Sequence, residues 1–425
     1  LYFNNIFSLL FRGLDRTQST LDDFAKNVFK YSDQSVQQLN FDNELVLLLA
    51  TCNLPFSTVD QPGFKRFIQF LGPRYKVKKR TTMAGGKLKK VYENLIEDVR
   101  DELSRDLKGA EAVTFTTDGW TAPNGDPYIS LSVQYITTNF QLKCIALEIQ
   151  NFTERHSAAN IRGAFDEMVG KYEAINDNKL TKYCVTDAAN NMRAAMCKAS
   201  VETKIDDHLT CIAHILNTCL RHASDKQPAI GVLIQKCKQL ARRTHQSHAD
   251  HKDIVKWCKE VNIKALKIVQ PCDTRWNSVQ MMIASILKMK DALLMAKAKT
   301  GTFEEEHYTG FIPSPEEFVV LKYLNNFLVK IRDVSENLSA DKNPTSHLVM
   351  PVLRDIHLLS KSISTIADNA GTHRAALRSF VEICQGEINK RLPTLGGEKE
   401  VYAIACMLHP YFKGSLLASM ERSTP

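Results

Sequence analysis

Two aspartates, each at the end of a strand-like segment, are the residues whose type and position could do chemistry. In Ala112–Trp120 apolar and small polar side chains alternate, which predicts a β-strand whose alternation stops at Asp118. A second strand-like run, Thr181–Asp187, also ends on an acid. Because open α/β sheets expose chemistry at the carboxyl ends of their strands, we expect Asp118 and Asp187 to be functional.

The chemistry that two such acids favour is metal-dependent. If the first strand lies beside the strand that follows the crossover helix, Asp118 and Asp187 come together, and nearby carboxylates repel unless a cation joins them. Mg²⁺ or Mn²⁺ suits oxygen ligands, and two such ions about 3.5–4 Å apart can cleave or join a phosphodiester. In the alternative interpretation each Asp caps the helix or turn that follows it, and spacing alone leaves both open.

The elements that must position these acids alternate in type. Strand-like runs at Tyr128–Tyr135 and Gln141–Glu148 follow the first strand at hairpin distance. A helix capped by Ser157 precedes the run that ends at Asp187, and a short fifth strand is expected at Leu209–Cys211. The order strand, strand, strand, helix, strand, helix predicts an α/β core.

The remaining sequence is helical in pattern. At 425 residues the chain predicts two or three domains. We expect an N-terminal helical region over 1–110, the first part of the core over 111–225, a helical insertion over 226–395, and the start of a return to the core over 396–425. The helices expected after the core are Val232–Arg243, Asp250–Val261, Arg275–Lys299, Pro315–Leu338, Thr345–Ile366 and Ala375–Leu392.

Composition narrows the class of protein. Hydrophobic residues make up 44% and charged residues 24%, as in a soluble globular protein. Eleven scattered cysteines without a signal-peptide pattern favour a reduced intracellular protein. No apolar run is long enough to span a bilayer. The net charge of +8 permits a polyanionic partner without requiring one.

A basic stretch after Pro73 is the clearest charge cluster. It contains Arg74, Lys76, Lys78, Lys79 and Arg80. It is either a solvated linker or a contact to the nucleic-acid backbone, where clustered cations release counterions. The spacing of a zinc finger does not occur in this region.

Four short motifs in a fixed order carry a resemblance. They are Thr117–Thr121, Val185–Asn191, Leu209–Asn217 and Asp273–Ser278. Together they resemble the hAT superfamily of DNA transposases and its domesticated, BED-type zinc finger relatives, over roughly residues 40–415. The resemblance implies an RNase H-like core interrupted by a large helical insertion.

The resemblance also implies an activity, which is metal-dependent cleavage and joining of DNA by two Asp and one Glu. Asp118 and Asp187 match the first two acids. In the family the third is a Glu in a late motif beside a dimerisation segment, and we find no match to it before Pro425. The third acid is therefore either outside this sequence or lost.

The resemblance also implies roles for two pairs of residues, Arg275 with Trp276 and Cys211 with His214. By itself Trp276 at a helix start favours a core position, but the matching Trp of active relatives stacks on a flipped base, and Arg275 could hold a phosphate. Cys211 and His214 lie on one helix face with Cys219 and His222, a set too extended for one zinc ion. The resemblance implies that Cys211 and His214 support the active site structurally.

Two functional hypotheses follow. The first is an active or ancestrally active transposase that uses Mg²⁺ or Mn²⁺ and binds DNA. The second is a domesticated, non-catalytic nuclear protein that binds DNA, regulates transcription or binds other proteins. Both imply a nuclear location and no membrane, and the resemblance adds a homo-oligomer formed through a C-terminal segment absent from this sequence.

Overall fold

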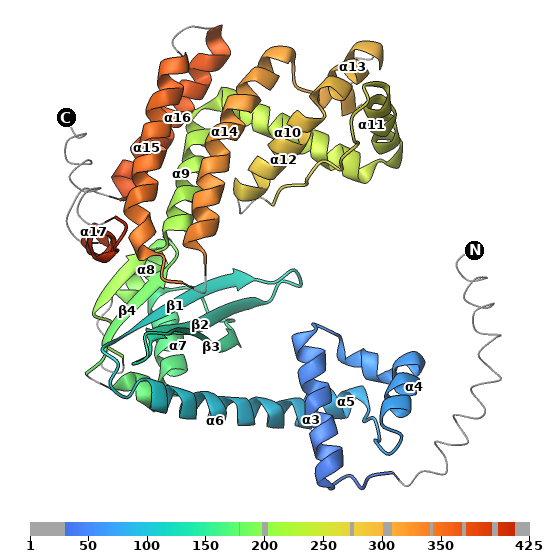
Figure 1. Ribbon diagram of the computed structural model, residues 1–425, viewed down its shortest axis with the longest axis vertical. Helices are drawn as coiled ribbons and strands as arrows, with labels where there is room; N and C mark the ends of the chain where they lie inside the picture. Colours follow the sequence, from blue (N-terminus) through green and yellow to red (C-terminus); the bar gives the residue numbers. More distant parts are fainter. Residues whose placement is uncertain are drawn as a thin grey trace, which may run out of the picture. The chain divides into compact units, whose positions relative to one another are not determined.

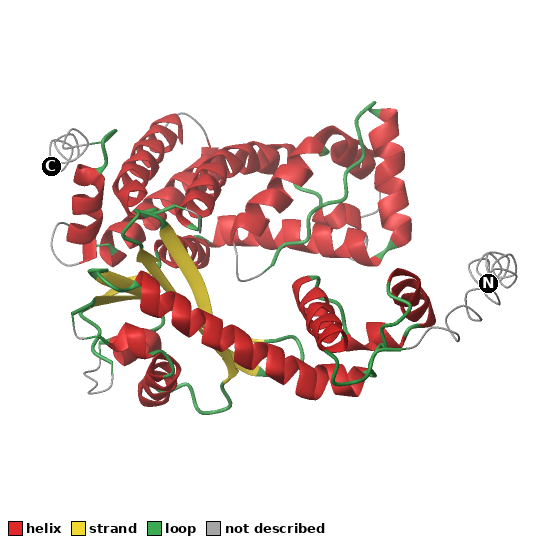
Figure 2. Cartoon of the chain, turned by 60° about the horizontal axis from the view of Figure 1, so that its bottom comes forward, coloured by secondary structure: helices red, strands yellow, loops and turns green. Residues whose placement is uncertain are grey.

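The computed structural model divides the chain into two compact units, Leu1–Lys108 and Gly109–Pro425 (Figure 1). The structure describes residues 30–177, 179–197, 203–272, 276–300, 308–340, 343–367, 371–392 and 398–412. Among the described residues, both units contain helices and only the second contains strands (Figure 2). None of the described helices is long and apolar enough to cross a membrane.

The first unit is helical over its described residues, as the sequence predicts. Its elements are α3 (Val36–Thr51), η1 (Phe56–Asp60), α4 (Pro62–Leu71), α5 (Arg80–Thr82), the π-helical turn η2 (Met83–Lys87) and α6 (Leu88–Asp106). Ser35 caps α3 by accepting the N–H of Gln38. Leu45, Val46 and Val59 form a small core with Tyr75 from the basic stretch. The basic stretch is therefore part of the folded unit.

The second unit begins with a mixed sheet of five strands among the described residues. They are β1 (Ala112–Thr121), β2 (Pro127–Ile136), β3 (Leu142–Asn151), β4 (Thr181–Thr186) and β5 (Asp207–Thr210). Their order is β3-β2-β1-β4-β5. The β1–β2 and β2–β3 pairs are antiparallel, whereas the β1–β4 and β4–β5 pairs are parallel. A sheet followed by helices confirms the predicted combination of an α/β part and a helical part.

The first strand differs from the prediction at one point. β1 continues through Asp118 to Thr121, because its pairing with β2 extends to the hairpin, where Thr121 lies opposite Pro127. Its pairing with β4 stops earlier, at Thr116 opposite Val185. The expected break in alternation at Asp118 therefore marks the end of the parallel pairing and not the end of the strand.

One face of the sheet is covered by α7 (Ala158–Gly170). The ring of Phe165 packs edge-on against Phe115 of β1, with ring centroids 5.4 Å apart. Phe115 alternates along β1 with the half-buried Thr114 and Thr116, which lie on the opposite face. The short elements η3 (Glu173–Asn176) and α8 (Asn190–Met196) flank β4.

The rest of the second unit is helical. Its elements are α9 (Ile212–Lys226), α10 (Pro228–Gln246), α11 (His248–Glu260), α12 (Trp276–Lys288), α13 (Lys290–Thr300), η4 (Tyr308–Phe311), α14 (Pro315–Leu338), η5 (Ser346–Leu348), α15 (Val349–Ala367), α16 (Gly371–Arg391) and α17 (Glu398–Leu408). These helices, from α9 onward, share one apolar core. α14 has the predicted bounds, starting at a capping box between Ser314 and Glu317. The single helix expected over Arg275–Lys299 is instead two, because the chain turns at the fully buried Met289.

Candidate active site and nucleic-acid interface

Asp118 lies in β1, and Asp187 directly follows the neighbouring parallel strand β4. The last paired residues of β1 and β4 are Thr116 and Val185, and each acid stands two residues beyond its member of that pair. Because side chains alternate along a strand, Asp118 falls on the face of Thr116, away from α7. Asp187 therefore follows the end of β4 directly, whereas Asp118 lies within β1 just beyond its parallel pairing. That the two acids form one site stays a prediction.

Neither acid caps a helix, since the N-cap of α8 is Ala189 and has no side-chain cap bond, but Asp187 does accept a hydrogen bond in the turn that follows it. An Asp187 carboxylate oxygen (Oδ1) accepts the N–H of Ala189 at 3.0 Å, at the turn into α8. Asp118 is followed by strand and is exposed, so it caps no helix. A carboxylate has two oxygens with several acceptor sites, so the bond to Ala189 leaves Asp187 able to serve as a ligand.

The hairpin beside Asp118 presents polar and aromatic groups on the same face. Trp120 lies opposite Tyr128, and their rings stack with centroids 5.7 Å apart at 20°. Ser130, opposite Asp118, donates its hydroxyl to the Asp118 carbonyl at 3.3 Å. This aromatic pair is not predicted by the sequence analysis, although Trp120 ends one predicted strand and Tyr128 begins the next, so cross-strand pairing in a hairpin would place the two rings opposite each other.

The described residues offer only part of a metal-ligand set. No group of three or more His, Cys, Asp or Glu side chains that could hold a metal ion occurs among the described residues. Asp118 and Asp187 have the oxygen chemistry that Mg²⁺ and Mn²⁺ prefer, but two carboxylates do not complete such a site. The described part of the chain therefore does not by itself fit a metal pair.

Cys211 and His214 lie near the Asp187 edge. Cys211 immediately precedes α9, and its N–H donates to the carbonyl of Thr186, the last residue of β4, at 2.8 Å. Both side chains are half-buried. Cys219 is buried in the helical core, and His222 contacts Glu387 at 3.4 Å. The four residues thus have separate surroundings, and the predicted structural support by Cys211 and His214 stays a prediction.

Trp276 is half-buried against the core of the helical region. Its ring lies 6.4 Å from the ring of Phe380 of α16, tilted by 46°. Its backbone N–H donates to the side-chain oxygen of Asn217 in α9 at 3.0 Å. Arg275 lies outside the described residues. The base-stacking role of Trp276 and the phosphate contact of Arg275 remain predictions.

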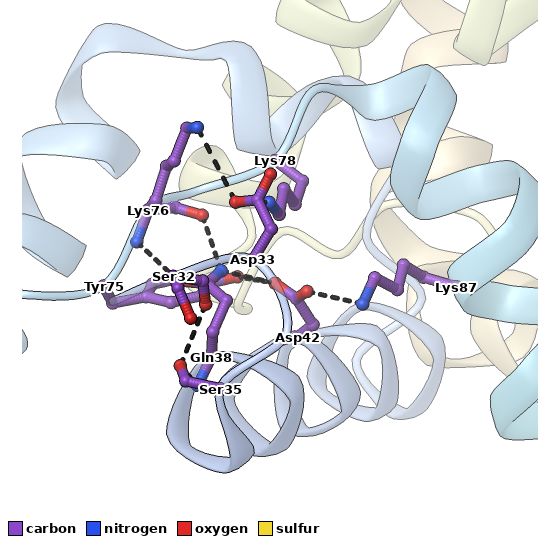
Figure 3. Close-up of polar contacts among 9 residues, drawn as sticks. All are labelled: Ser32, Asp33, Ser35, Gln38, Asp42, Tyr75, Lys76, Lys78 and Lys87. Carbon is purple, nitrogen blue, oxygen red and sulfur yellow. Dashed lines mark hydrogen bonds and ion pairs between the residues drawn. The ribbon is translucent and has the colours of Figure 1, made fainter. Parts of the chain in front are cut away.

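The basic stretch packs against the first unit through Tyr75 and Lys78, while its other cations are exposed to solvent (Figure 3). Lys78 pairs with Asp33 and has only 13% of its side chain exposed, while Lys76 lies 3.6 Å from the same carboxylate. The hydrogen bond from Lys78 is the main cause that lowers the pKa of Asp33. Local charge density alone could not reveal these partners, because Asp33 lies more than forty residues earlier in the sequence.

A buried carboxylate anchors the same stretch. Asp42 is fully buried in α3 and accepts hydrogen bonds from the Tyr75 hydroxyl at 2.9 Å and from Gln38 at 3.0 Å. Lys87 forms an ion pair with its second oxygen at 2.8 Å. Burial, with the bond to Asp42, raises the pKa of Tyr75 far above its ordinary value. Figure 3 shows that these side chains converge from α3, the basic stretch and, for Lys87, the end of η2.

The other cations of the stretch are exposed. Arg74 lies over the ring of Tyr31, 4.6 Å from its centroid, and Arg80 is 3.9 Å from Asp60 with 63% of its side chain exposed. Lys79 is exposed. The residues of the stretch that can face a phosphate backbone are therefore chiefly Arg74, Lys79 and Arg80. The sequence alone does not distinguish them from Lys78, because that distinction depends on tertiary contacts.

Comparison with known proteins identifies relatives. The family model of the ZBED1 RNase-like helical domain matches residues 209–327, from within β5 to within α14. "Putative AC transposase" of Zea mays is 24% identical over 322 residues, covering 72% of this chain and 37% of that protein. Zinc finger BED domain-containing protein RICESLEEPER 2 of Oryza sativa subsp. japonica is 22% identical, covering 78% of this chain and 46% of that protein.

A third relative is the transposable element Hobo transposase of Drosophila melanogaster, 25% identical over 55% of this chain and 35% of that protein. The chain is a relative of the hAT transposases and of BED-type zinc finger proteins. It spans less than half the length of these three proteins. The resemblance seen in the four ordered motifs of this hAT-related chain is thereby confirmed.

Proposed function

We propose that this hAT-related chain binds DNA and that its sheet is an RNase H-like core that carries two acids of a metal-binding set. The observation that carries the proposal is the position of Asp118 and Asp187, each two residues beyond the last paired residues of adjacent parallel strands. The strand order, with three antiparallel strands followed by two parallel ones, supports an RNase H-like core.

Mg²⁺ or Mn²⁺ bound with a third ligand would supply activation of the attacking oxygen and stabilisation of the leaving oxygen of a phosphodiester. Asp118 and Asp187 are the residues that would hold it. The chain's own residues otherwise position DNA. Trp120 and Tyr128 offer an aromatic surface on the face of Asp118, and Trp276 offers an indole for an unstacked base.

The cations that support a DNA contact lie in both units. In the first unit they are Arg74, Lys79 and Arg80, together with Lys76, which is exposed although it lies close to Asp33. In the second unit Lys252, Lys256 and Lys259 fall on one exposed stripe of α11, opposite the buried Ile254 and Cys258. Phosphate contacts of this kind bind DNA without reading its sequence. The proposal includes a nuclear location, where such a substrate is found, and homo-oligomerisation.

A labelled DNA duplex tests the proposal directly. We expect the chain to bind it with a strong salt dependence, equally in Mn²⁺ and in a chelator, because the contacts come from Lys and Arg. Asp118→Asn should bind at least as well, since it removes a negative charge from the same face. Absence of salt-dependent binding would contradict the proposal.

The same incubations with labelled duplex, analysed for cleavage, separate the two functional hypotheses. Mn²⁺-dependent cleavage that Asp118→Asn abolishes would assign an active enzyme. Binding without cleavage would assign the alternative, a domesticated DNA-binding protein.

A further inference from the structure

The side chain of Asn217 meets the start of the helix that carries Trp276. The Asn217 side-chain oxygen accepts the backbone N–H of Trp276 at 3.0 Å, between residues 59 positions apart. Trp276 is the first residue of α12. The first N–H groups of a helix lack acceptors within that helix, and an Asn oxygen is among the best replacements. Asn217 of α9 therefore caps the N-terminus of α12 from a neighbouring helix.

The helix that presents Asn217 is rooted at the Asp187 edge of the sheet. The N–H of Cys211, just before α9, donates to the carbonyl of Thr186, whose next residue is Asp187. Asn217 follows Cys211 by six residues, about 9 Å along the helix axis. One rigid element thus joins the end of β4 to the first residue of α12.

The hydrogen bond with Asn217 involves only the backbone N–H of Trp276, and the indole ring makes different contacts. The indole packs against the helical core and lies 6.4 Å from the Phe380 ring. The position of the Trp276 backbone and the tilt of its ring are therefore set by different residues. Loss of the Asn217 bond would free the start of α12 while the core contacts of its later turns persist.

We propose that Asn217 is a positioning residue that fixes Trp276 relative to the Asp187 edge, so that an unpaired base stacked on the indole is presented to the two acids. The inference rests on the proposed function, in which Trp276 is the platform for that base. A purely structural cap would affect stability alone, whereas a positioning residue also determines the surroundings of the indole.

The first experiment reads the indole itself. The chain has three tryptophans, so Trp120→Phe combined with Trp257→Phe leaves Trp276 as the only one. In this background Asn217→Leu should shift Trp276 emission to longer wavelength and increase its quenching by acrylamide. Asn217→Asp keeps an acceptor oxygen beside the positive helix N-terminus and should restore both signals to the parent values.

A matched control removes a different hydrogen-bond acceptor of α12, one that lies on the neighbouring helix α14. The Asn325 side-chain oxygen accepts from Gln280 of α12 at 2.9 Å, so Asn325→Leu deletes a comparable bond without touching the N–H of Trp276. Thermal unfolding confirms that each variant is folded. Unchanged Trp276 signals in a folded Asn217→Leu protein, or equal changes in Asn325→Leu, would overturn the inference.

The second experiment reads base stacking in the otherwise unchanged chain. The probe is a duplex with one unpaired 2-aminopurine, whose fluorescence falls when it stacks on an aromatic ring. We expect Asn217→Leu to weaken binding of this probe by roughly two- to thirtyfold, the range for loss of a helix cap, with unchanged affinity for a fully paired duplex. Asn217→Asp should bind like the parent.

The two experiments separate the two possible failures. If the parent does not quench the unpaired 2-aminopurine, the base-stacking role in the proposed function is wrong, and the emission of Trp276 alone decides whether Asn217 positions it. If the parent and Asn217→Leu quench equally, Trp276 binds the base without help from Asn217 and the inference is wrong.

Discussion

At the scale of single residues, neighbouring lysines of the basic stretch have different roles. Lys78 is bonded to Asp33 and largely covered, while Lys79 is exposed. Alternate residues of an extended segment point to opposite sides, so a run of cations divides between the fold and the solvent. A count of Lys and Arg in such a run therefore overstates the charge that is available to a polyanion.

This division predicts opposite effects for two charge reversals. Lys79→Glu should reduce the slope of log affinity for duplex DNA against log salt by about one and leave the melting temperature unchanged, because it removes a phosphate contact. Lys78→Glu should lower the melting temperature, because it places two carboxylates together at Asp33. A titration of DNA binding against salt, with thermal unfolding of each variant, checks both. A loss of stability in Lys79→Glu would refute the assignment.

At the scale of elements, a histidine pair joins two segments of the helical region. His347 in η5 stacks on His409, which follows α17, with ring centroids 4.3 Å apart at 3°. Phe412 packs beside both rings. Burial, with a smaller contribution from the charge of His409, lowers the pKa of His347 below its ordinary 6.5. The pair therefore favours a neutral His347 in the folded state.

A pH dependence of α17 follows from the sign of this shift. The unfolded chain binds the proton first as the pH falls, so the contribution of His347 to stability is complete above about pH 6.5 and is lost as the pH falls through its lower folded-state pKa. Amide hydrogen exchange of α17 should accelerate between about pH 7 and about pH 5, beyond the intrinsic pH effect. His347→Phe should flatten this change, and the control His357→Phe, at a half-buried histidine of α15 whose pKa is also lowered by burial, should not.

At the scale of the whole molecule, the chain divides into two compact units between Lys108 and Gly109. Each unit has its own core, that of the first built around Leu45, Val46 and Tyr75. Units with separate cores are expected to unfold separately. The polar network around Asp42 belongs to the first unit alone.

We therefore expect two unfolding transitions, only one of which responds to Tyr75→Phe. This change removes the hydroxyl that donates to the buried Asp42 carboxylate, and should cost the first unit about 1–3 kcal/mol of unfolding free energy. Urea titration followed by circular dichroism and by Trp fluorescence resolves the units, because all three tryptophans lie after Lys108. A fluorescence transition that moves with Tyr75→Phe would contradict independent units.

The sequence by itself determined the local features of this protein. Alternation and helical periodicity depend on residues a few positions apart, so they located the strands that lead to Asp118 and Asp187 and the bounds of α14. The four short motifs can likewise be recognised from adjacent residues, and their order indicated the relatives. The parallel register of the strands had to be assumed, and the structure supplied it.

The tertiary structure alone decided which residues meet across the chain. The partner of Lys78 lies 45 positions away and that of Trp276 lies 59 positions away, and no local period encodes such contacts. They form because the burial of separate apolar faces brings distant helices together. Those contacts cover Lys78 while they leave Lys79 exposed to solvent. They also bond Trp276 to α9, a helix that starts at the Asp187 edge of the sheet.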